Sequence, residues 1–236
     1  MSSLTILDRP EHQRRIGRLA WVMAWVGLVF GQLHALARVA TEDGASDLDE
    51  GFMHLWAEPA STAFAPLLDW ASPNVVYLTY GKVWFLVLLA ATLAAFVVHR
   101  RRSVAGFRGA ERWAWRVTRV ALVLATAGCF MTYWTQWGAG NERLLDIVFI
   151  TLIPILLLTL IASTFLGVVL IRRGVGLPAW LLAFAVPGLF AITEVTSLGN
   201  VFLPIAFAFG ILGRRIAREP HPATAVSSSR TAPVVH

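Results

Sequence analysis

The chain has 236 residues, of which 57% are hydrophobic and only 14% are charged, whereas about 25% of the residues in soluble domains are charged. Together with a mean hydropathy of +0.65, this composition excludes a soluble globular protein, a disordered protein and a fibrous protein. The net charge of +6 does not indicate a nucleic-acid partner, because nearly all of the 20 basic residues lie in short clusters between apolar runs. The composition therefore predicts a multi-pass membrane protein.

Apolar runs of about 17–25 residues cross a bilayer as helices. The last apolar region, 178–213, is too long for one helix and is interrupted at 193–200 by polar residues with turn chemistry. The runs predict six transmembrane helices, at about 19–37, 75–98, 117–134, 147–171, 178–195 and 198–213. We therefore expect an all-α, polytopic membrane helical bundle formed by a single domain, 1–218, with a disordered cytoplasmic tail at 219–236.

The two short helices at 178–195 and 198–213 have an alternative, which is a re-entrant hairpin. The second helix has 16 residues and covers roughly 24 Å of a hydrocarbon core about 30 Å thick. Pro187 and Pro204 would bend the two arms further. Two full crossings remain the favoured interpretation, because a short helix can thin the bilayer locally.

The distribution of charge predicts that both termini are cytoplasmic. With the amino terminus inside, 17 of the 20 basic residues fall in the four cytoplasmic segments, whereas ten of the 14 acidic residues fall outside. Every cytoplasmic segment then follows the positive-inside rule. A signal peptide cleaved after residues 35–37 is the competing interpretation of the first segment, but Arg38 directly after that site and the polar Gln32 and His34 before it argue against cleavage.

The outer loop at 41–73 is the only sizeable exterior segment that the sequence predicts. Its first half, 41–50, is acidic and is expected to be irregular. Its second half, 58–71, begins with Pro59 at a helix-start position and carries apolar residues at helical spacing. With Trp56 and Trp70 near its ends, this segment is expected to be a helix lying in the outer membrane interface, or a lid packed on the spans.

The first span carries small and polar residues at steps of three and four, which places them on one helix face. These residues are Ala20, Ala24, Gly27, Gly31, His34 and Arg38. Gly27 and Gly31 form a GxxxG motif that lets another helix approach closely. This face is therefore expected to point into the protein, with His34 and Arg38 at its outer end. A packing stripe whose last turn happens to be polar remains the alternative.

Ionisable residues gather at the outer end of the predicted bundle, where Lys82, Asp146 and Glu194 lie at a depth similar to that of His34 and Arg38. A charge in the hydrocarbon costs about 2.5–3.5 kcal/mol, so such side chains face the bundle interior and pair with one another. These five residues are the candidate ligand-binding residues. Two alternatives stay open: a salt-bridged structural cluster and, for Lys82, a side chain that extends to the membrane surface.

The sequence lacks the signatures of several chemistries. The single cysteine, Cys129, excludes an internal disulfide and a CxxC pair, and His34 and His99 lie at opposite membrane depths, which does not suit a bis-histidine haem. A metal site formed by His34, His54 and Glu58 has too few ligands. No GxSxG, HExxH, P-loop or GxGxxG motif is present. We therefore expect neither a cofactor nor a metal, and an enzyme is not favoured.

These features favour a plasma-membrane protein that binds or passes a small polar ligand, an ion or a lipid headgroup through a charged pocket at its outer side. One alternative is a scaffold or assembly subunit that docks a partner on its glycine face and interfacial helix. The other is a membrane enzyme that acts on a lipid-linked substrate, with Glu194 or His34 transferring a proton.

The expected partners are the bilayer itself, anionic lipid headgroups at the basic cytoplasmic loop 99–116, and a second copy of the chain or a partner membrane subunit. The predominance of arginine over lysine is typical of a GC-rich bacterial genome. It predicts the inner membrane of a bacterium as the location.

Overall fold

The computed structural model describes residues 9–48, 51–104, 106, 109–134 and 142–219, with 43, 47 and 142–149 described through their backbone alone. Every regular element within these ranges is a helix, and none is a strand, which confirms the all-α prediction. In chain order the elements are α1 (Pro10–Val39), η2 (Glu42–Leu48), α2 (His54–Ala63), α3 (Ala65–Leu68), α4 (Pro73–Val104), α5 (Ala110–Trp134), α6 (Glu142–Ile171), α7 (Leu177–Ala183), α8 (Ala185–Thr193), η3 (Leu198–Phe202) and α9 (Leu203–Arg218). The tail predicted at 219–236 lies outside the described residues except for Glu219.

Five helical segments are long and apolar enough to cross a membrane, which supports a multi-pass membrane protein. These segments are Pro10–Val39, Pro73–Val104, Ala110–Trp134, Ile150–Ile171 and Leu198–Arg218. The outer surface of α6 agrees with this interpretation, because large apolar side chains repeat along one exposed face at helical steps. They are Ile150, Ile153, Leu157, Ile161 and Phe165. A continuous exposed stripe of this kind is unfavourable in water and ordinary in contact with lipid.

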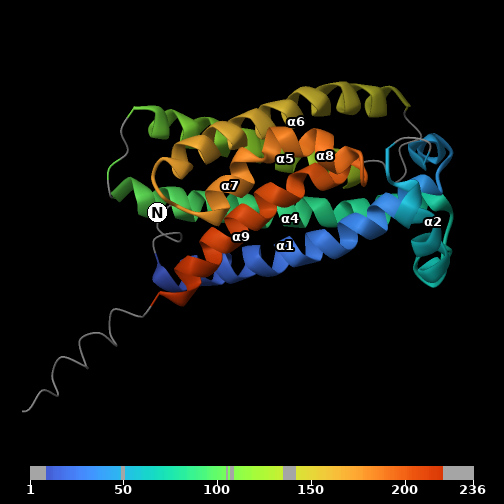
Figure 1. The fold of residues 1–236 in the computed structure, drawn as a ribbon, viewed down its shortest axis with the longest axis horizontal. Coiled ribbons are helices and arrows are strands. Elements are labelled where there is room, and N and C mark those ends of the chain that lie inside the picture. The colour runs from blue at the N-terminus through green and yellow to red at the C-terminus, as the bar shows by residue number, and fades with distance from the viewer. Residues whose placement is uncertain (1–8, 49–50, 105, 107–108, 135–141, 220–236) are drawn as a thin grey trace, which may run out of the picture.

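The helices run side by side, with α1 packed along both α4 and α9, and α5 placed between α4 and α6 (Figure 1). The largest apolar core surrounds Trp115 and Phe209. Close backbone contact joins α1 to α9, because a Cβ atom at Gly17 would overlap the backbone carbonyl of Gly213. At Gly27 a Cβ would lie 3.1 Å from the Val87 methyl groups of α4. The glycine face of the first span is thus filled by helices of the same chain, which leaves it unavailable to the partner that a scaffold would dock there.

The fifth predicted span is divided into α7 and α8 by a break at Phe184. Pro187 explains the break, because it has no N–H and its ring clashes with the carbonyl group four residues earlier. The neighbouring N–H of Val186 donates instead to Thr164 Oγ1 on α6, at 3.0 Å. This side-chain acceptor satisfies a backbone group that would otherwise be buried without a partner.

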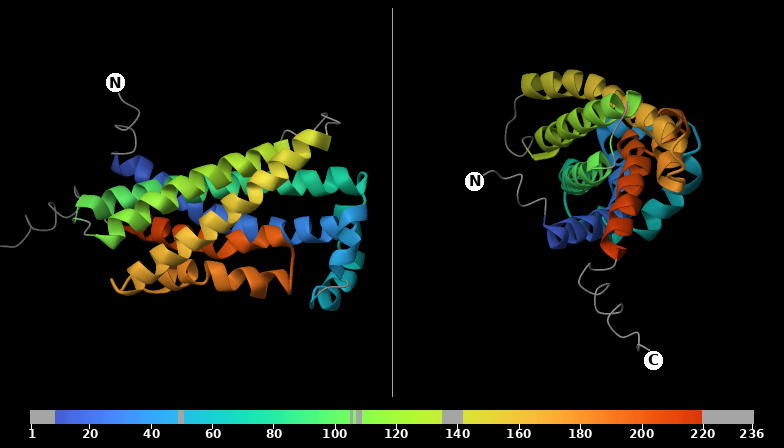
Figure 2. Two further views of the ribbon diagram at one scale, coloured as in Figure 1. Left: turned by 90° about the horizontal axis from the view of Figure 1, so that it is seen from above. Right: turned by 90° about the vertical axis from the view of Figure 1, so that its left-hand side faces the viewer.

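Helices α2 and α3, together with η2, cover one end of the bundle (Figures 1 and 2); we call residues 42–48 and 51–68 the cap. Met53 and Ala57 of the cap are buried against Leu36 of α1 and Val76 of α4. The structure corrects two expectations here. The acidic segment forms a short 3-10 helix, and the following helix begins at His54, which puts Pro59 in its interior. A new start at Ala65 with Pro66 in the first turn separates α3 from α2.

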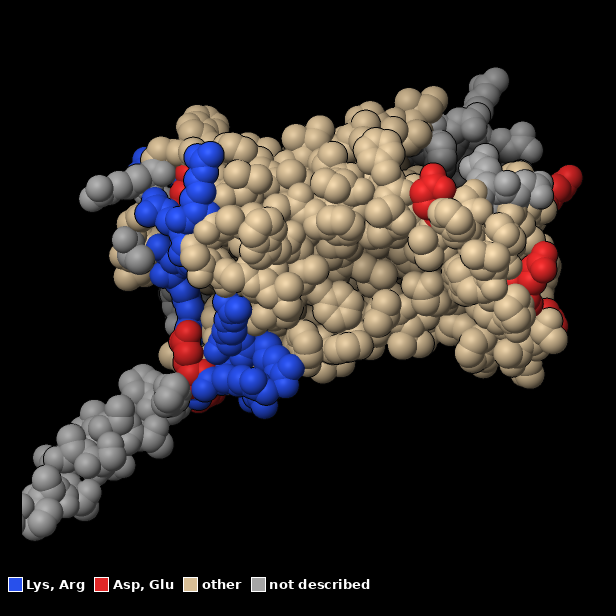
Figure 3. Space-filling model, in the orientation of Figure 1, with Lys and Arg blue, Asp and Glu red and all other residues tan. Residues whose placement is uncertain are grey.

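Charged side chains separate along the long axis of the molecule. Lys and Arg form a band at one end of the face shown in Figure 3, whereas Asp and Glu occur without them at the opposite end, where the cap lies. We call these ends the basic end and the acidic end. The last turns of α4 and α9 and the residues after α6 contribute arginines to the basic end.

Candidate functional site

His34 is buried near the acidic end among aromatic rings from two neighbouring helices. Its ring stacks on Tyr77 of α4, with the ring centres 4.5 Å apart and the planes 25° apart. Its Nε2 atom lies 3.1 Å from the hydroxyl oxygen of Tyr133 on α5. Gly81 on α4 makes room for the Tyr133 ring, which would overlap a Cβ atom at that position. The histidine therefore occupies a fixed place between α1, α4 and α5.

Asn200 in η3 is fully buried against the face of α1 that carries His34. Its Nδ2 donates to the carbonyl oxygen of Gly31 at 3.3 Å and to Thr196 Oγ1 at 2.6 Å. Thr196 in turn donates to Gln32 Oε1 at 3.3 Å. The amide reaches the α1 backbone because Gly31 has no side chain: a Cβ there would overlap Asn200 Oδ1. These contacts attach the turn between α8 and α9 to α1.

Several buried or partly buried polar side chains thus lie together near the acidic end, and we call this set the polar layer. Its members are His34, Tyr77, Trp84, Tyr133, Thr196, Ser197 and Asn200. Four buried atoms in the layer have no hydrogen-bond partner among the described residues. They are His34 Nδ1, Trp84 Nε1, Ser197 Oγ and Asn200 Oδ1. Each such atom costs about 1–3 kcal/mol when left unsatisfied, so their concentration in one place requires an explanation.

Gly199 shows where two of these atoms meet. A Cβ atom at Gly199 would lie 3.4 Å from His34 Nδ1 and 3.5 Å from Trp84 Nε1, which are ordinary contact distances. An atom of methyl or water size therefore fits between the two nitrogen atoms without displacing either ring. Trp84 Nε1 can only donate, Asn200 Oδ1 can only accept, and the serine hydroxyl can do both. The layer offers hydrogen bonds of both kinds.

Of the five residues predicted from the sequence, the four whose side chains the structure describes do not gather into one charged pocket. His34 belongs to the polar layer, and Arg38 lies one turn further along α1, half-buried under η2. Lys82 Nζ lies 5.1 Å from the centre of the Trp134 ring. Glu194 is exposed at the end of α8, and no described residue forms an ion pair with it. Asp146 lies in α6, but its side chain is outside the described part of the chain. A ligand-binding role for the five stays a prediction.

The residues that sequence reasoning missed are mainly neutral. Trp84, Ser197 and Asn200 carry no charge, and nothing in a single sequence separates them from other polar residues near helix ends. The sequence feature that could have indicated the position of the polar layer is the small-residue face of α1. Gly31 on this face contacts Asn200, and His34 lies three residues later on the same face.

A metal centre finds no support within the described residues, which contain no cluster of three or more histidine, cysteine or acidic side chains suited to a metal ion. His34 and Glu194, the residues expected to transfer a proton in a membrane enzyme, differ in their surroundings, since the first is buried and the second is exposed. No protein family, no curated protein and no solved structure matches the chain. The fold and the polar layer are the observations from which a function is inferred.

Proposed function

We propose that this chain is a six-span protein of a bacterial inner membrane that binds a small, neutral, polar molecule in the polar layer, from the outer side. The observation that carries the proposal is the group of four buried, unpaired polar atoms on His34, Trp84, Ser197 and Asn200. A bound molecule that offers both donors and acceptors would pair with atoms of this group and reduce the cost of burying them.

The polar layer contains both an unpaired donor and an unpaired acceptor, which favours a neutral ligand over an ion. A cation would meet the N–H of Trp84, which cannot accept a hydrogen bond, and an anion would meet the oxygen of Asn200, which cannot donate one. The close spacing around Gly199 favours a small ligand, such as one that presents a hydroxyl or primary amide group.

Two contacts support six crossings over a re-entrant hairpin. Arg215 near the basic end donates to the Val175 carbonyl oxygen before α7, at 2.9 Å. The Glu194 carbonyl oxygen after α8 accepts from Phe52 N of the cap, at 2.6 Å. The segment α7–α8 therefore extends from the basic end to the cap, alongside α9 (Figure 2). The four arginine-rich segments then face the cytoplasm, as the positive-inside rule requires.

The cap contacts the turn that carries part of the polar layer. Trp56 Nε1 donates to the Val195 carbonyl oxygen at 2.5 Å, two residues before the unpaired hydroxyl of Ser197. Entry of a ligand from this side requires the cap to separate from the turn at 194–197. Such opening breaks two hydrogen bonds at the surface, which is within the range of ordinary loop motions.

Ligand-dependent thermal stability tests the proposal. Purified protein is melted with glycerol or acetamide, and we expect at least one of them to raise the Tm by about 5 °C at 100 times its Kd. Gly199→Ala fills the space between the two nitrogen atoms and should abolish this shift. The matched control is Ser163→Ala, which removes an unpaired buried hydroxyl from α6 and should retain it.

Non-specific stabilisation by a cosolvent would raise the Tm of all three proteins equally. That result, or the absence of any shift in the wild-type chain, would contradict the proposal.

A further inference from the structure

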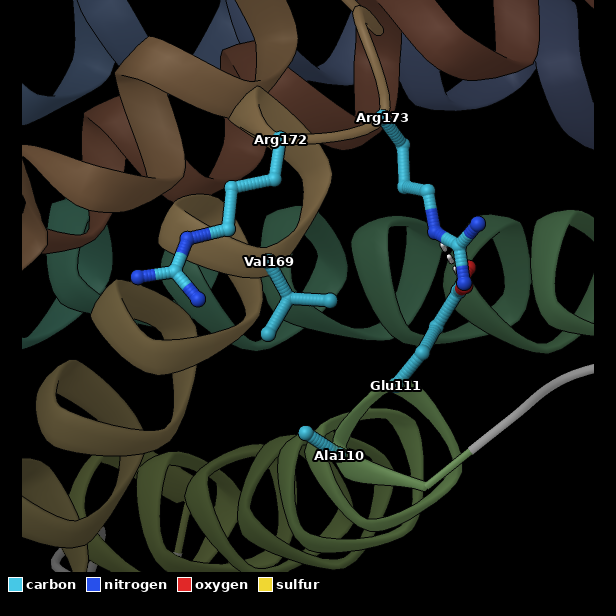
Figure 4. A pocket seen from close by; sticks show the side chains of 5 residues that line it. All are labelled: Ala110, Glu111, Val169, Arg172 and Arg173. Carbon is cyan, nitrogen blue, oxygen red and sulfur yellow. Dashed lines mark ion pairs between the residues drawn. The ribbon is translucent and has the colours of Figure 1, made fainter.

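A buried carboxylate at the basic end joins arginines from two different segments. Glu111 lies in the first turn of α5, and its side chain is only 5% exposed. Its Oε1 accepts from Arg102 of α4 at 3.2 Å, and its Oε2 lies 3.2 Å from Nε of Arg173, which follows α6. Figure 4 shows the pair between Glu111 and Arg173. The carboxylate thus fixes two guanidinium groups at the junction of α4, α5 and α6.

An open cavity of about 300 Å³ lies beside this carboxylate, between the start of α5 and the end of α6 (Figure 4). Its lining residues are Ala110, Glu111, Val169, Arg172 and Arg173. Cavities that hold small ligands begin at about this size. The first turn of α5 contributes backbone N–H groups that have no partner within the helix, which favours a negative charge at this position.

The charge balance at the cavity favours an anion. Arg172 and Arg173 outnumber the single carboxylate in the lining, and Arg102 contacts that carboxylate from α4. Each guanidinium group has five N–H donors, of which Glu111 engages a minority. The Nε atom of Arg102 is also buried without a partner among the described residues. Guanidinium groups match the oxygen atoms of a phosphate in pairs, which makes phosphate the anion best suited to this arrangement.

The surroundings identify the source of the phosphate as a membrane lipid. Trp113 in the first turns of α5 and Trp180 in α7 are each 62% exposed near the same end of the bundle. Tryptophan side chains of this kind mark the level of the lipid headgroups. The exposed apolar faces of α5 and α6 continue from this level along the bundle and can contact acyl chains.

We propose that this cavity binds the phosphate group of an anionic phospholipid from the leaflet at the basic end. The proposal rests on the membrane location of the chain and is independent of the polar layer, so either site can fail without the other. Arg172 and Arg173 are the phosphate-binding residues, and Glu111 is a positioning residue that holds Arg173 at the cavity.

Native mass spectrometry of the full-length protein tests this site. The protein is incubated in mild detergent with equal amounts of phosphatidylglycerol and phosphatidylcholine, and the detergent is then removed in the mass spectrometer. We expect one phosphatidylglycerol per chain to be retained, with retention about tenfold lower in Arg172→Gln and Arg173→Gln, because each removes a charge-assisted contact. Arg172 has no ion pair in the described structure, so its variant is expected to fold normally. Arg218→Gln removes an exposed arginine of α9 and should bind as the wild type does.

Three results would overturn the proposal. They are equal retention of the two lipids, an equal loss in Arg218→Gln, and displacement of the lipid by millimolar glycerol phosphate, which would identify a soluble anion as the ligand. Melting curves of the three variants without added lipid identify any general loss of folding. If Arg173→Gln unfolds, Arg172→Gln alone decides the question.

Discussion

Asn200 shows how one buried amide can join two segments of a membrane bundle. Its Nδ2 bonds to the α1 backbone and to Thr196, whereas its Oδ1 remains without a described partner. The arrangement depends on Gly31, because the space that a Cβ would occupy there is taken by the amide oxygen and, at 2.9 Å, by the Trp84 ring.

Gly31→Ala is therefore expected to destabilise the protein, although alanine favours helices more than glycine does. Overpacking of this kind costs about 1–3 kcal/mol, which reversible unfolding in mixed micelles can measure. Gly199→Ala is the control, because its Cβ makes only ordinary contacts and should change the free energy of unfolding by about 0.5 kcal/mol or less. Equal stability of the two variants would show that Asn200 does not pack on α1 as described.

Glu194 provides a second prediction, in which a substitution is expected to leave the stability of the protein nearly unchanged. Because its carboxylate is exposed and has no described ion-pair partner, Glu194→Gln should change the free energy of unfolding by no more than about 0.5 kcal/mol. Removing one member of a buried ion pair costs about 3–5 kcal/mol. A loss of that size in the same unfolding measurement would restore the expectation that Glu194 is paired inside the bundle.

For single residues, the sequence predicts how deep a residue lies in the membrane better than it predicts which side chains surround that residue. The position of His34 on the small-residue face of α1 predicts that its side chain points into the protein, and the side chain is buried. Glu194 lies near the predicted outer end, but the break between α8 and η3 exposes it. Which side chains of a turn point inward depends on its backbone path, and hydropathy carries no information on that path.

Among the elements, the break between α7 and α8 is the feature with the clearest local cause. Pro187 interrupts the helical hydrogen bonds, and Thr164 of α6 supplies an acceptor for the Val186 N–H at 3.0 Å. A hydroxyl from a neighbouring helix commonly satisfies backbone groups that a proline frees within a membrane.

Thr164→Val should destabilise the protein by about 1–3 kcal/mol, because it leaves the part-buried Val186 N–H without an acceptor. Pro187→Ala allows α7 and α8 to join into one helix, in which that N–H bonds within the helix instead. The double variant should therefore lose less stability than the sum of the single variants, as a double-mutant cycle in mixed micelles would show. Strict additivity would contradict this account of the break.

The apolar runs predicted most helices well, because the length and hydropathy of a span are direct requirements of the bilayer. Helices α1 and α4 extend beyond the predicted runs at both ends, since charged and aromatic residues continue a helix outside the hydrocarbon. The cap was harder to predict. Pro59 is a frequent helix-start residue, but contacts of Met53 and Ala57 with α1 and α4 favour a helix that begins earlier.

At the scale of the whole molecule, the two proposed sites lie at opposite ends, and these ends differ in charge. The polar layer lies near the acidic end, where Trp56 of the cap contacts the turn that carries Ser197. The arginine-lined cavity (Figure 4) lies at the basic end. Alternating charge along the chain predicted this separation, because each crossing brings successive loops to opposite ends. The tertiary contacts that build each site could not be predicted in this way, since they join residues such as Gly31 and Asn200 that are far apart in sequence.

Cysteine accessibility in intact cells tests the membrane crossing and the orientation on which both sites depend. The single native thiol, that of Cys129, is buried and is removed by Cys129→Ser. In this background, cysteines are introduced singly at Ser46 in the cap and at Ser103 at the end of α4. Both positions are exposed. We expect an impermeant maleimide to label Ser46→Cys in intact cells and Ser103→Cys only after the cells are permeabilised. The reverse pattern, or labelling of both positions from outside, would contradict the account.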